Sequence, residues 1–362
     1  MARAWLGNAV FLAGAVFLPV LAAETACRLA GYRGLEQYRP DPELGWVPEP
    51  GQTTVTRVGS LPVRVNDDGF RGDPLERPKP AGAIRIFVLG ASTTFGWGVR
   101  QEETYHQMLE RTLNDTARAT GATDRYEIVN GGVIGFNLRQ VARYMRRIAQ
   151  RYEPDGSIVT YTFNDAWNKF GSAGAPPLGR VLAGVRAKNL LRRSALYNWL
   201  VDLLARRRYA ASAARDPGHV AESQTGDGPA TAADLADFRA TLDTMLEVAR
   251  GAHVPLAFVV PAGRAQGRPW PRQAEMTRFA AGARLPLLDL VSSFGSGSGD
   301  TLYLPGDAVH PSPHGHLLMA RLLYVELCRA ALTAAPGAPG EIYRAGCGAG
   351  LLPQKHRARP RI

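Results

Sequence analysis

The chain has 362 residues, of which 45% are hydrophobic and 21% charged, enough for one large or two modest globular domains. The net charge of +11 raises the question of nucleic-acid binding, but only four of the 43 basic residues are lysines and the arginines are spread along the chain. No nucleic-acid-binding motif accompanies them, so we exclude nucleic acid as a partner. The oligomeric state stays open.

An uncharged apolar run opens the chain. It covers twenty residues, Ala4 to Ala23, and is long enough to cross a membrane as a helix. We predict a retained transmembrane anchor within 1–30, with a cleaved signal peptide and a buried soluble helix as the alternatives. Arg3 precedes the run and three arginines follow it between positions 28 and 39, a count that favours a cytoplasmic location for the rest of the chain.

A Pro/Gly-rich stretch follows over 31–84 and contains DPELGWVPEPG and VRVNDDGFRGD. Short β-like runs alternate there with turn residues. We predict a small strand-and-loop segment rather than a second domain.

Apolar strands alternate with helices over 85–335. This alternation predicts an α/β domain with a mostly parallel sheet covered by helices on both faces. Residues 209–231 are small and polar and suggest a flexible insertion, and 336–362 form a C-terminal tail. The expected strands are IRIFVLG (84–90), RYEIVNGG (125–132), GSIVTYTFND (156–165), VPLAFVVP (254–261) and LPLLDL (285–290), and the expected helices cover 104–115, 137–152, 189–206, 232–251, 272–283 and 314–332.

The three cysteines are Cys27, Cys328 and Cys347. They form no CxxC pair and no Cys/His group with metal-ligand spacing. Cys328 and Cys347 are close in sequence and would pair in an oxidising compartment; two buried thiols are the alternative. No convincing lipobox precedes Cys27, so we do not predict a lipoprotein.

The first three expected strands each end in an unusual cluster: GASTTFG, NGGVIGFN and FNDAW. Ligand sites of parallel sheets form at the carboxyl ends of the strands, so Ser92 is a candidate nucleophile rather than only a turn residue. Gly135 lets a backbone N–H approach a substrate closely, and Asn164 offers an amide, so both are candidate oxyanion donors. The alternatives are a strand-to-helix turn at Gly135 and a helix N-cap at Asn164–Asp165.

A second group of reactive residues lies near the C-terminus, in GDAVHPSPHGH. A serine hydroxyl needs a neighbouring base, and a carboxylate can orient and stabilise an imidazole. Asp307 and His310, three residues apart, can meet within one turn. We expect His314 and His316, at the start of the last helix, to be structural or solvent-facing.

Taken in order, Ser92, Gly135, Asn164, Asp307 and His310 resemble the motif blocks of the SGNH/GDSL hydrolase superfamily. The resemblance covers roughly 85–332 and implies a flavodoxin-like three-layer α/β/α sandwich. The stretches NDDGFRGD, VPLAFVVP and LPLLDL also look like members that carry an N-terminal membrane segment.

The sequence departs from the family pattern at two positions. Ala91 stands where an aspartate usually precedes the serine, and Phe163 stands where a glycine usually precedes the asparagine. Neither replaced residue carries the chemistry, so we expect activity to survive, with Phe163 narrowing the pocket. The absence of a GxSxG elbow disfavours an α/β-hydrolase.

The resemblance implies a serine esterase or acylhydrolase that cleaves a lipid or acylated-glycan ester through an acyl-enzyme on Ser92. His310 would be the base, Asp307 its orienting acid, and the oxyanion hole would comprise the Ser92 and Gly135 N–H groups and the Asn164 amide. No metal or cofactor is expected. The alternatives are an O-acyltransferase acting on cell-envelope polysaccharide and an inactive binding module.

The resemblance and the Cys328/Cys347 pair outweigh the arginine count in assigning a compartment. We therefore expect a membrane-anchored protein whose catalytic domain is extracytoplasmic, on the periplasmic or outer face.

Overall fold

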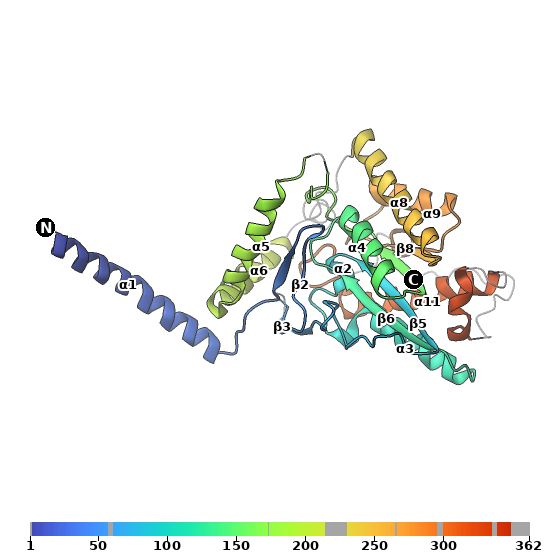
Figure 1. Cartoon of the computed structure of the whole chain (residues 1–362), viewed down its shortest axis with the longest axis horizontal. Coiled ribbons are helices and arrows are strands. Elements are labelled where there is room, and N and C mark those ends of the chain that lie inside the picture. The colour runs from blue at the N-terminus through green and yellow to red at the C-terminus, as the bar shows by residue number, and fades with distance from the viewer. Residues whose placement is uncertain are drawn as a thin grey trace.

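A five-stranded sheet forms the centre of the structure (Figure 1). The structure is a computed structural model that describes residues 2–56, 61–172, 174–213, 230–264, 266–294, 300–334 and 339–348. All neighbouring strands of this sheet are parallel, in the order β6-β5-β7-β8-β9. The strands are β5 (Ala83–Gly90), β6 (Arg125–Gly132), β7 (Gly156–Thr160), β8 (Leu256–Val260) and β9 (Leu287–Asp289).

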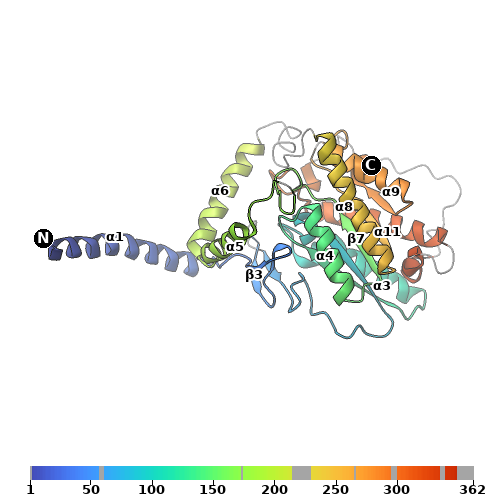
Figure 2. The same cartoon turned by 45° about the horizontal axis from the view of Figure 1, so that its top comes forward.

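Helices cover both faces of the sheet (Figure 2). On one face α4 packs against α8 and α8 against α9, and on the other face α3 packs against α11. Counted within the sheet, the strand order is 2-1-3-4-5, so the predicted flavodoxin-like three-layer sandwich is confirmed. The helices are α3 (Tyr105–Ala119), α4 (Leu138–Arg151), α8 (Ala232–Gly251), α9 (Pro271–Gly282) and α11 (Pro313–Thr333), with short α2 (Ser92–Phe95), α10 (Leu290–Phe294) and 3-10 turns η1 (Gln101–Glu103), η2 (Asp300–Leu302) and η3 (Pro339–Gly346).

The apolar pattern of the sequence explains these layers. Every residue of β7 and β8 is buried, as expected for strands covered on both faces. Apolar residues three or four positions apart on α4, Leu138, Val141, Met145 and Ile148, are buried against the core. The side chain of Asn137 accepts a hydrogen bond from the Gln140 N–H and so caps the start of this helix.

The third strand is shorter than its apolar sequence predicts. We expected it over 156–165, but β7 ends at Thr160. The chain then turns, because the Asp165 carboxylate accepts a hydrogen bond from the Thr162 hydroxyl and another from the backbone N–H of Leu138. The N–H of Tyr161 still donates to the Val259 carbonyl of β8, and the residues after Tyr161 turn toward the neighbouring loop and leave the ladder.

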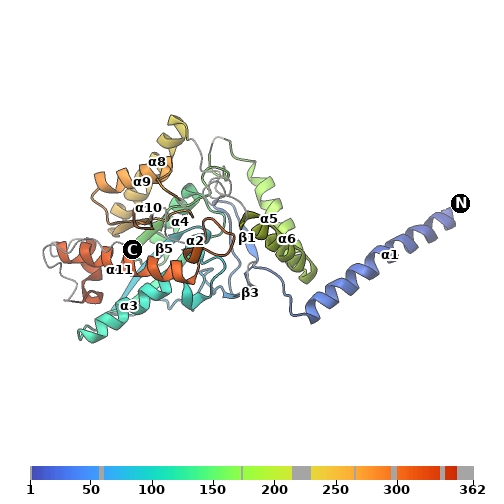
Figure 3. The same ribbon diagram turned by 180° about the vertical axis from the view of Figure 1, so that it is seen from behind.

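Two small antiparallel hairpins follow the N-terminal helix α1 (Ala2–Leu29). Helix α1 projects away from the rest of the molecule in all three views (Figure 1, Figure 2 and Figure 3). Its segment Phe11–Leu29 is long and apolar enough to cross a membrane, with a mean hydropathy of 1.5. The predicted helix is therefore present, and its insertion into a membrane stays a prediction. The strands of the hairpins are β1 (Tyr38–Asp41), β2 (Gly45–Pro48), β3 (Thr53–Val55) and β4 (Pro62–Arg64).

Two helices stand where we predicted one over 189–206. They are α5 (Leu178–Arg192) and α6 (Ala195–Ala213), and the single-helix prediction is wrong. The break occurs because the Ser194 hydroxyl accepts the Tyr197 N–H and the Glu24 carboxylate accepts the N–H groups of Ala195 and Leu196. Helix α6 also continues through Ala213, into the stretch that we interpreted as an insertion, and 214–229 lies outside the described residues.

A disulfide joins Cys328 of α11 to Cys347, which follows η3. Of the two alternatives left open by the sequence, the structure has the bonded pair. Cys27 is a free thiol in α1. Of the predicted tail, residues 339–348 pack against α11 and α3, and 349–362 lie outside the described part of the chain.

Candidate active site

Ser92 is the first residue of α2, and a single residue, Ala91, separates it from the end of β5. Glycines make this sharp turn possible. A Cβ on Gly90 would lie 2.3 Å from the Thr94 hydroxyl, and one on Gly132 would lie 2.3 Å from the Phe95 nitrogen. Gly90 and Gly132 face each other in the ladder, so the ends of β5 and β6 together leave room for α2. The turn therefore holds the half-buried Ser92 at the carboxyl edge of the sheet.

Ser92, His310 and Asp307 form one hydrogen-bonded chain. His310 Nε2 lies 2.8 Å from Ser92 Oγ, and His310 Nδ1 lies 2.8 Å from Asp307 Oδ2. Ser92 and His310 are 218 positions apart in the sequence, whereas Asp307 and His310 are three apart. Serine hydrolases use this arrangement of hydroxyl, imidazole and carboxylate. The structure thus brings together the three residues predicted as catalytic.

The Asp307 carboxylate is buried, and both of its oxygens take part in hydrogen bonds. Its second oxygen, Oδ1, accepts the backbone N–H groups of Val309 and His310 at 2.8 and 2.9 Å. Burial alone raises the pKa of Asp307, but the attraction of His310 and these hydrogen bonds outweigh it, and the pKa lies below its ordinary value of 3.8. Asp307 is therefore ionised at neutral pH and directs its charge at the Nδ1 edge of His310.

Gly135 and Asn164 lie in adjacent loops after β6 and β7. Gly135 has a φ of +83°, which a residue with a side chain rarely adopts, and a Cβ there would lie 3.3 Å from the Trp46 ring. Asn164 Nδ2 donates to the carbonyl of Phe136 at 2.8 Å. This bond uses one of the two N–H donors of the amide. The structure thus brings both predicted oxyanion donors to the carboxyl edge that carries Ser92.

Further hydrogen bonds join the two loops. Asn168 Nδ2 donates to the Gly135 carbonyl at 2.7 Å, and Asn137 Nδ2 donates to the carbonyls of Asn168 and Phe170 at 2.8 and 2.9 Å. Residues 163–167 form a turn and begin no helix, so the N-cap alternative for Asn164 is wrong. These bonds hold the Gly135 and Asn164 loops as one unit.

Sequence reasoning missed two supporting residues, Arg71 and Trp46, both from the N-terminal strand-and-loop segment. The buried Arg71 guanidinium donates to the carbonyls of Phe95, Gly96 and Val99 at 2.6 to 2.8 Å, and so braces the loop after Ser92. Burial lowers the pKa of Arg71 to about 10, which leaves it charged at neutral pH.

Trp46 supports the neighbouring loop. Its indole N–H donates to the Ile134 carbonyl at 2.9 Å, one residue before Gly135. The motif NDDGFRGD contains Arg71, but no local pattern reveals which distant carbonyls an arginine will contact.

The other two histidines near His310 have different environments. His314 is exposed, and His316 is buried with its ring stacked on Tyr105 at a centroid distance of 5.7 Å. Its Nδ1 accepts the Tyr105 N–H at 3.2 Å, and burial lowers the pKa of His316 to about 3. His316 is therefore neutral at neutral pH, and both placements agree with the expectation that these residues are structural or solvent-facing.

The two departures from the family pattern are both buried. Ala91 is 5% exposed. The Phe163 ring packs edge-on against Tyr161 and Trp270, at centroid distances of 5.5 and 5.7 Å. Phe163 thus belongs to the hydrophobic core.

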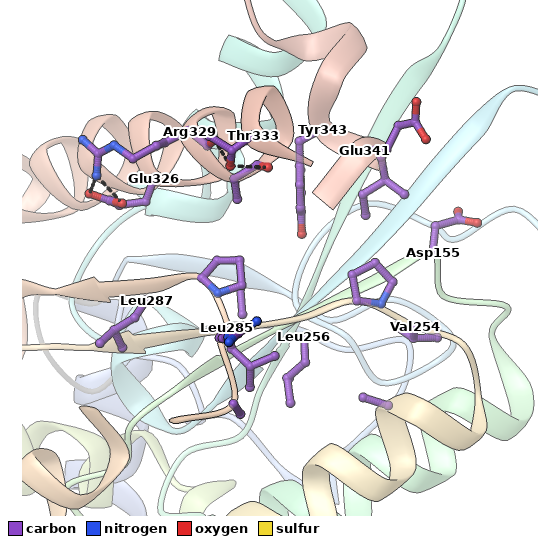
Figure 4. Close-up of a pocket in the computed structure, with 18 of the residues that line it drawn as sticks. Asp155, Val254, Leu256, Leu285, Leu287, Glu326, Arg329, Thr333, Glu341 and Tyr343 are labelled. Carbon is purple, nitrogen blue, oxygen red and sulfur yellow. Dashed lines mark hydrogen bonds and ion pairs between the residues drawn. The ribbon is translucent and has the colours of Figure 1, made fainter. Parts of the chain in front are cut away.

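An open cavity of about 1630 Å³ lies at the opposite end of the sheet (Figure 4). Leu256 and Leu287 line it at the amino ends of β8 and β9, and Tyr343 points into it from η3. Ser92, in contrast, follows the carboxyl end of β5. This cavity therefore does not serve the Ser92 site.

Among the described residues, no group of three or more His, Cys, Asp or Glu side chains is placed to hold a metal ion.

No family model and no curated protein matches the chain. Similar solved structures include an acetyl xylan esterase, with 15% identity and a TM-score of 0.42 over 67% of this chain and 98% of that one. An esterase from Pseudoalteromonas sp. aligns with 13% identity and a TM-score of 0.40 over 68% of this chain and 97% of that one. A lipase/acylhydrolase from Enterococcus faecalis aligns with 17% identity and a TM-score of 0.39 over 66% and 92%.

Proposed function

We propose that the protein is a serine esterase of the SGNH/GDSL type, with Ser92 as nucleophile, His310 as general base and Asp307 as its orienting acid. The observation that carries the proposal is the Ser92–His310–Asp307 chain, with 2.8 Å at both of its links. It is supported by the order of the sequence motifs. The direct test is turnover of short- and long-chain acyl esters and acetylated glycans by the purified full-length chain. No turnover, together with no labelling by a fluorophosphonate, would refute the proposal in favour of a binding module.

The proposed reaction uses these three residues in two steps. Ser92 Oγ attacks the ester carbonyl carbon while His310 Nε2 takes the hydroxyl proton, and ionised Asp307 stabilises the resulting imidazolium. His310 then returns this proton to the departing alcohol, which leaves an acyl group on Ser92. A water molecule, deprotonated by His310, attacks the acyl carbonyl, and Ser92 recovers its proton as the acid leaves.

An acyltransferase differs only in using an acceptor hydroxyl instead of water, so product analysis with an added sugar acceptor separates the two reactions.

The oxyanion of each tetrahedral intermediate needs donors that are already in place. We assign this role to the backbone N–H groups of Ser92 and Gly135. The third donor is the side-chain N–H of Asn164 that does not donate to the Phe136 carbonyl. The hydrogen bonds that join the Gly135 and Asn164 loops hold the donors in position before substrate binds, and such preorganisation is what makes them effective.

Replacing Asn164 with alanine is therefore expected to lower kcat by about 10²–10³-fold with little change in KM, because the lost bond strengthens only as charge develops. Loss of the bond to Phe136 should also cost about 1 kcal/mol of stability. Steady-state kinetics and thermal unfolding measure both effects. Asn114→Ala is a matched control, because Asn114 binds the backbone of Tyr126 away from the site and should change only stability. A normal kcat in Asn164→Ala would reduce this residue to a structural role.

We place the catalytic domain on the extracytoplasmic side of a membrane, anchored by α1. The disulfide between Cys328 and Cys347 supports this placement, because such bonds persist in oxidising compartments. Protein isolated from its native membrane under denaturing, non-reducing conditions should take up alkylating reagent at one thiol, Cys27, and at all three cysteines after reduction. Alkylation of three thiols without reductant, read by intact mass, would contradict both the bond and the compartment.

A further inference from the structure

Exposed apolar side chains are concentrated on the α5–α6 pair. Outside α1, eight large hydrophobic residues of the described chain are exposed, and six of them belong to these two helices. The six are Leu178 (41%), Leu190 (70%), Leu191 (52%), Trp199 (39%), Leu200 (44%) and Leu204 (50%). A soluble surface rarely gathers its exposed apolar residues in this way without a partner.

The same helices are strongly basic. Residues 178–213 contain eight arginines and lysines and a single acid, Asp202, which is buried and paired with Arg206 at 2.8 Å. Arg186, Lys188, Arg193 and Arg207 are exposed. Apolar side chains interspersed with basic ones suit the boundary of a bilayer, where the former enter the acyl region and the latter contact lipid phosphates.

The base of α1 is fixed to the start of α6. The Glu24 carboxylate accepts the Ser194 hydroxyl at 2.7 Å and the N–H groups of Ala195 and Leu196 at 3.0 and 2.9 Å. Arg28 of α1 also donates to the Arg193 carbonyl at 3.2 Å. Glu24 follows directly on the uncharged run that ends at Ala23. If that run crosses the bilayer, these bonds hold the α5–α6 junction at the membrane surface.

The direction of α6 agrees with this position. In Figure 2, α6 runs across the line of α1 rather than along it. With α1 crossing the membrane, α6 then lies along the surface, where Leu200 and Leu204, one helical turn apart, face the same way. Figure 1 and Figure 3 show α5 and α6 between α1 and the rest of the molecule.

We propose that the α5–α6 pair is a second membrane contact, which inserts Leu190, Leu191, Leu200 and Leu204 into the bilayer interface and binds anionic lipid through its exposed basic residues. The contact rests on the predicted insertion of α1 and is independent of the chemistry at Ser92. It applies to either face of the membrane. It fixes the orientation of the catalytic domain, which a single-helix anchor would leave free to rotate.

A fluorescent probe at the surface tests this contact. The full-length chain carrying Cys27→Ser leaves only the disulfide-bonded cysteines, so a single new thiol can be labelled with a nitrobenzoxadiazole dye. The labelled positions are Leu200→Cys, Leu204→Cys and, as a matched control, Val325→Cys, since Val325 is 37% exposed on α11. Each variant is reconstituted into nanodiscs of phosphatidylcholine and phosphatidylglycerol, with and without lipid carrying a doxyl quencher on its acyl chain.

The dye at positions 200 and 204 should show a blue-shifted emission and lose fluorescence with doxyl lipid, and the dye at 325 should do neither. Removing phosphatidylglycerol should weaken the quenching at 200 and 204, as should Arg186→Glu combined with Lys188→Glu. Equal, weak quenching at all three positions would overturn the proposal. So would shielding of positions 200 and 204 from aqueous iodide without doxyl quenching, because that result would mean a second protein copy covers the helices. Ester turnover should stay unchanged in the charge variant, which separates this test from that of the proposed function.

Discussion

Replacing Ser92 with alanine is expected to abolish labelling by a fluorophosphonate and to lower kcat for ester turnover by roughly 10⁴-fold or more. The variant removes the only atom that can carry the acyl group in the proposed mechanism, while the oxyanion donors and the substrate-binding surface remain. The fold should survive, because Ser92 is half-buried and its backbone carbonyl still accepts the N–H groups of Gly96 and Trp97. Labelling, steady-state kinetics and thermal unfolding measure the three effects.

Ser293→Ala provides the matched control, since Ser293 is exposed on α10 and its hydroxyl donates only locally, to the Asp289 carbonyl. It should keep full labelling and full activity. Undiminished labelling of Ser92→Ala would show that another residue carries the reaction and would refute the assigned nucleophile.

Asp307→Asn should produce the second largest effect, a fall in kcat of about 10³–10⁴-fold with the fold intact. The asparagine carbonyl can still accept the N–H groups of Val309 and His310. Its NH₂ group, however, faces His310 Nδ1 as a donor, and so favours the tautomer whose proton lies on Nε2. That tautomer cannot accept the proton of Ser92. The variant also lacks the negative charge that stabilises the imidazolium.

The lowered pKa of Asp307 also predicts how the defect of Asp307→Asn depends on pH. Because its folded pKa lies below 3.8, the carboxylate adds stability that is present above that value and is lost as the pH falls through the folded pKa. The wild-type residue is thus ionised throughout any assay near neutral pH, and the defect of the variant should persist across that range.

Asp289→Asn is the control, because Asp289 accepts the N–H groups of residues two and three positions later, as Asp307 does, but at the end of β9. A wild-type kcat in Asp307→Asn, or an equal loss in both variants, would exclude the proposed role of Asp307.

Most of the fold could be predicted because its signals are local and repeated. RYEIVNGG, a strand-like run that ends in glycines, predicts a strand at 125–132, where β6 lies. Failures occurred where a distant group decides the outcome. Tyr161 and Phe163 after Thr160 suggest that the strand continues. The chain turns instead, because the Asp165 carboxylate accepts the N–H of Leu138, which is 27 residues away in the sequence. The break at Ser194 likewise depends on Glu24, some 170 residues away.

The candidate site divides in the same way. Candidate residues with reactive groups could be selected from the sequence, because few side chains supply a nucleophile, a base or an amide. Ser92, Gly135 and Asn164 follow strand ends, and Asp307 and His310 share one short motif. Residues that act only by bracing those groups could not be selected in this way. Arg71 looks like any arginine in a turn until the fold brings it to three carbonyl oxygens of the Ser92 loop.

The bracing by Arg71 and Trp46 has a consequence for how such a protein can be cut and recombined. Composition places a boundary before residue 85, but an enzyme shortened to that point would lose both braces, and the carbonyls of Phe95, Gly96 and Val99 would lose their buried donor. The smallest transferable catalytic unit therefore begins upstream of Trp46. An exchange of α1 for another N-terminal helix, in evolution or in the laboratory, would have to keep Glu24, because its carboxylate accepts the N–H groups of Ala195 and Leu196 at the start of α6.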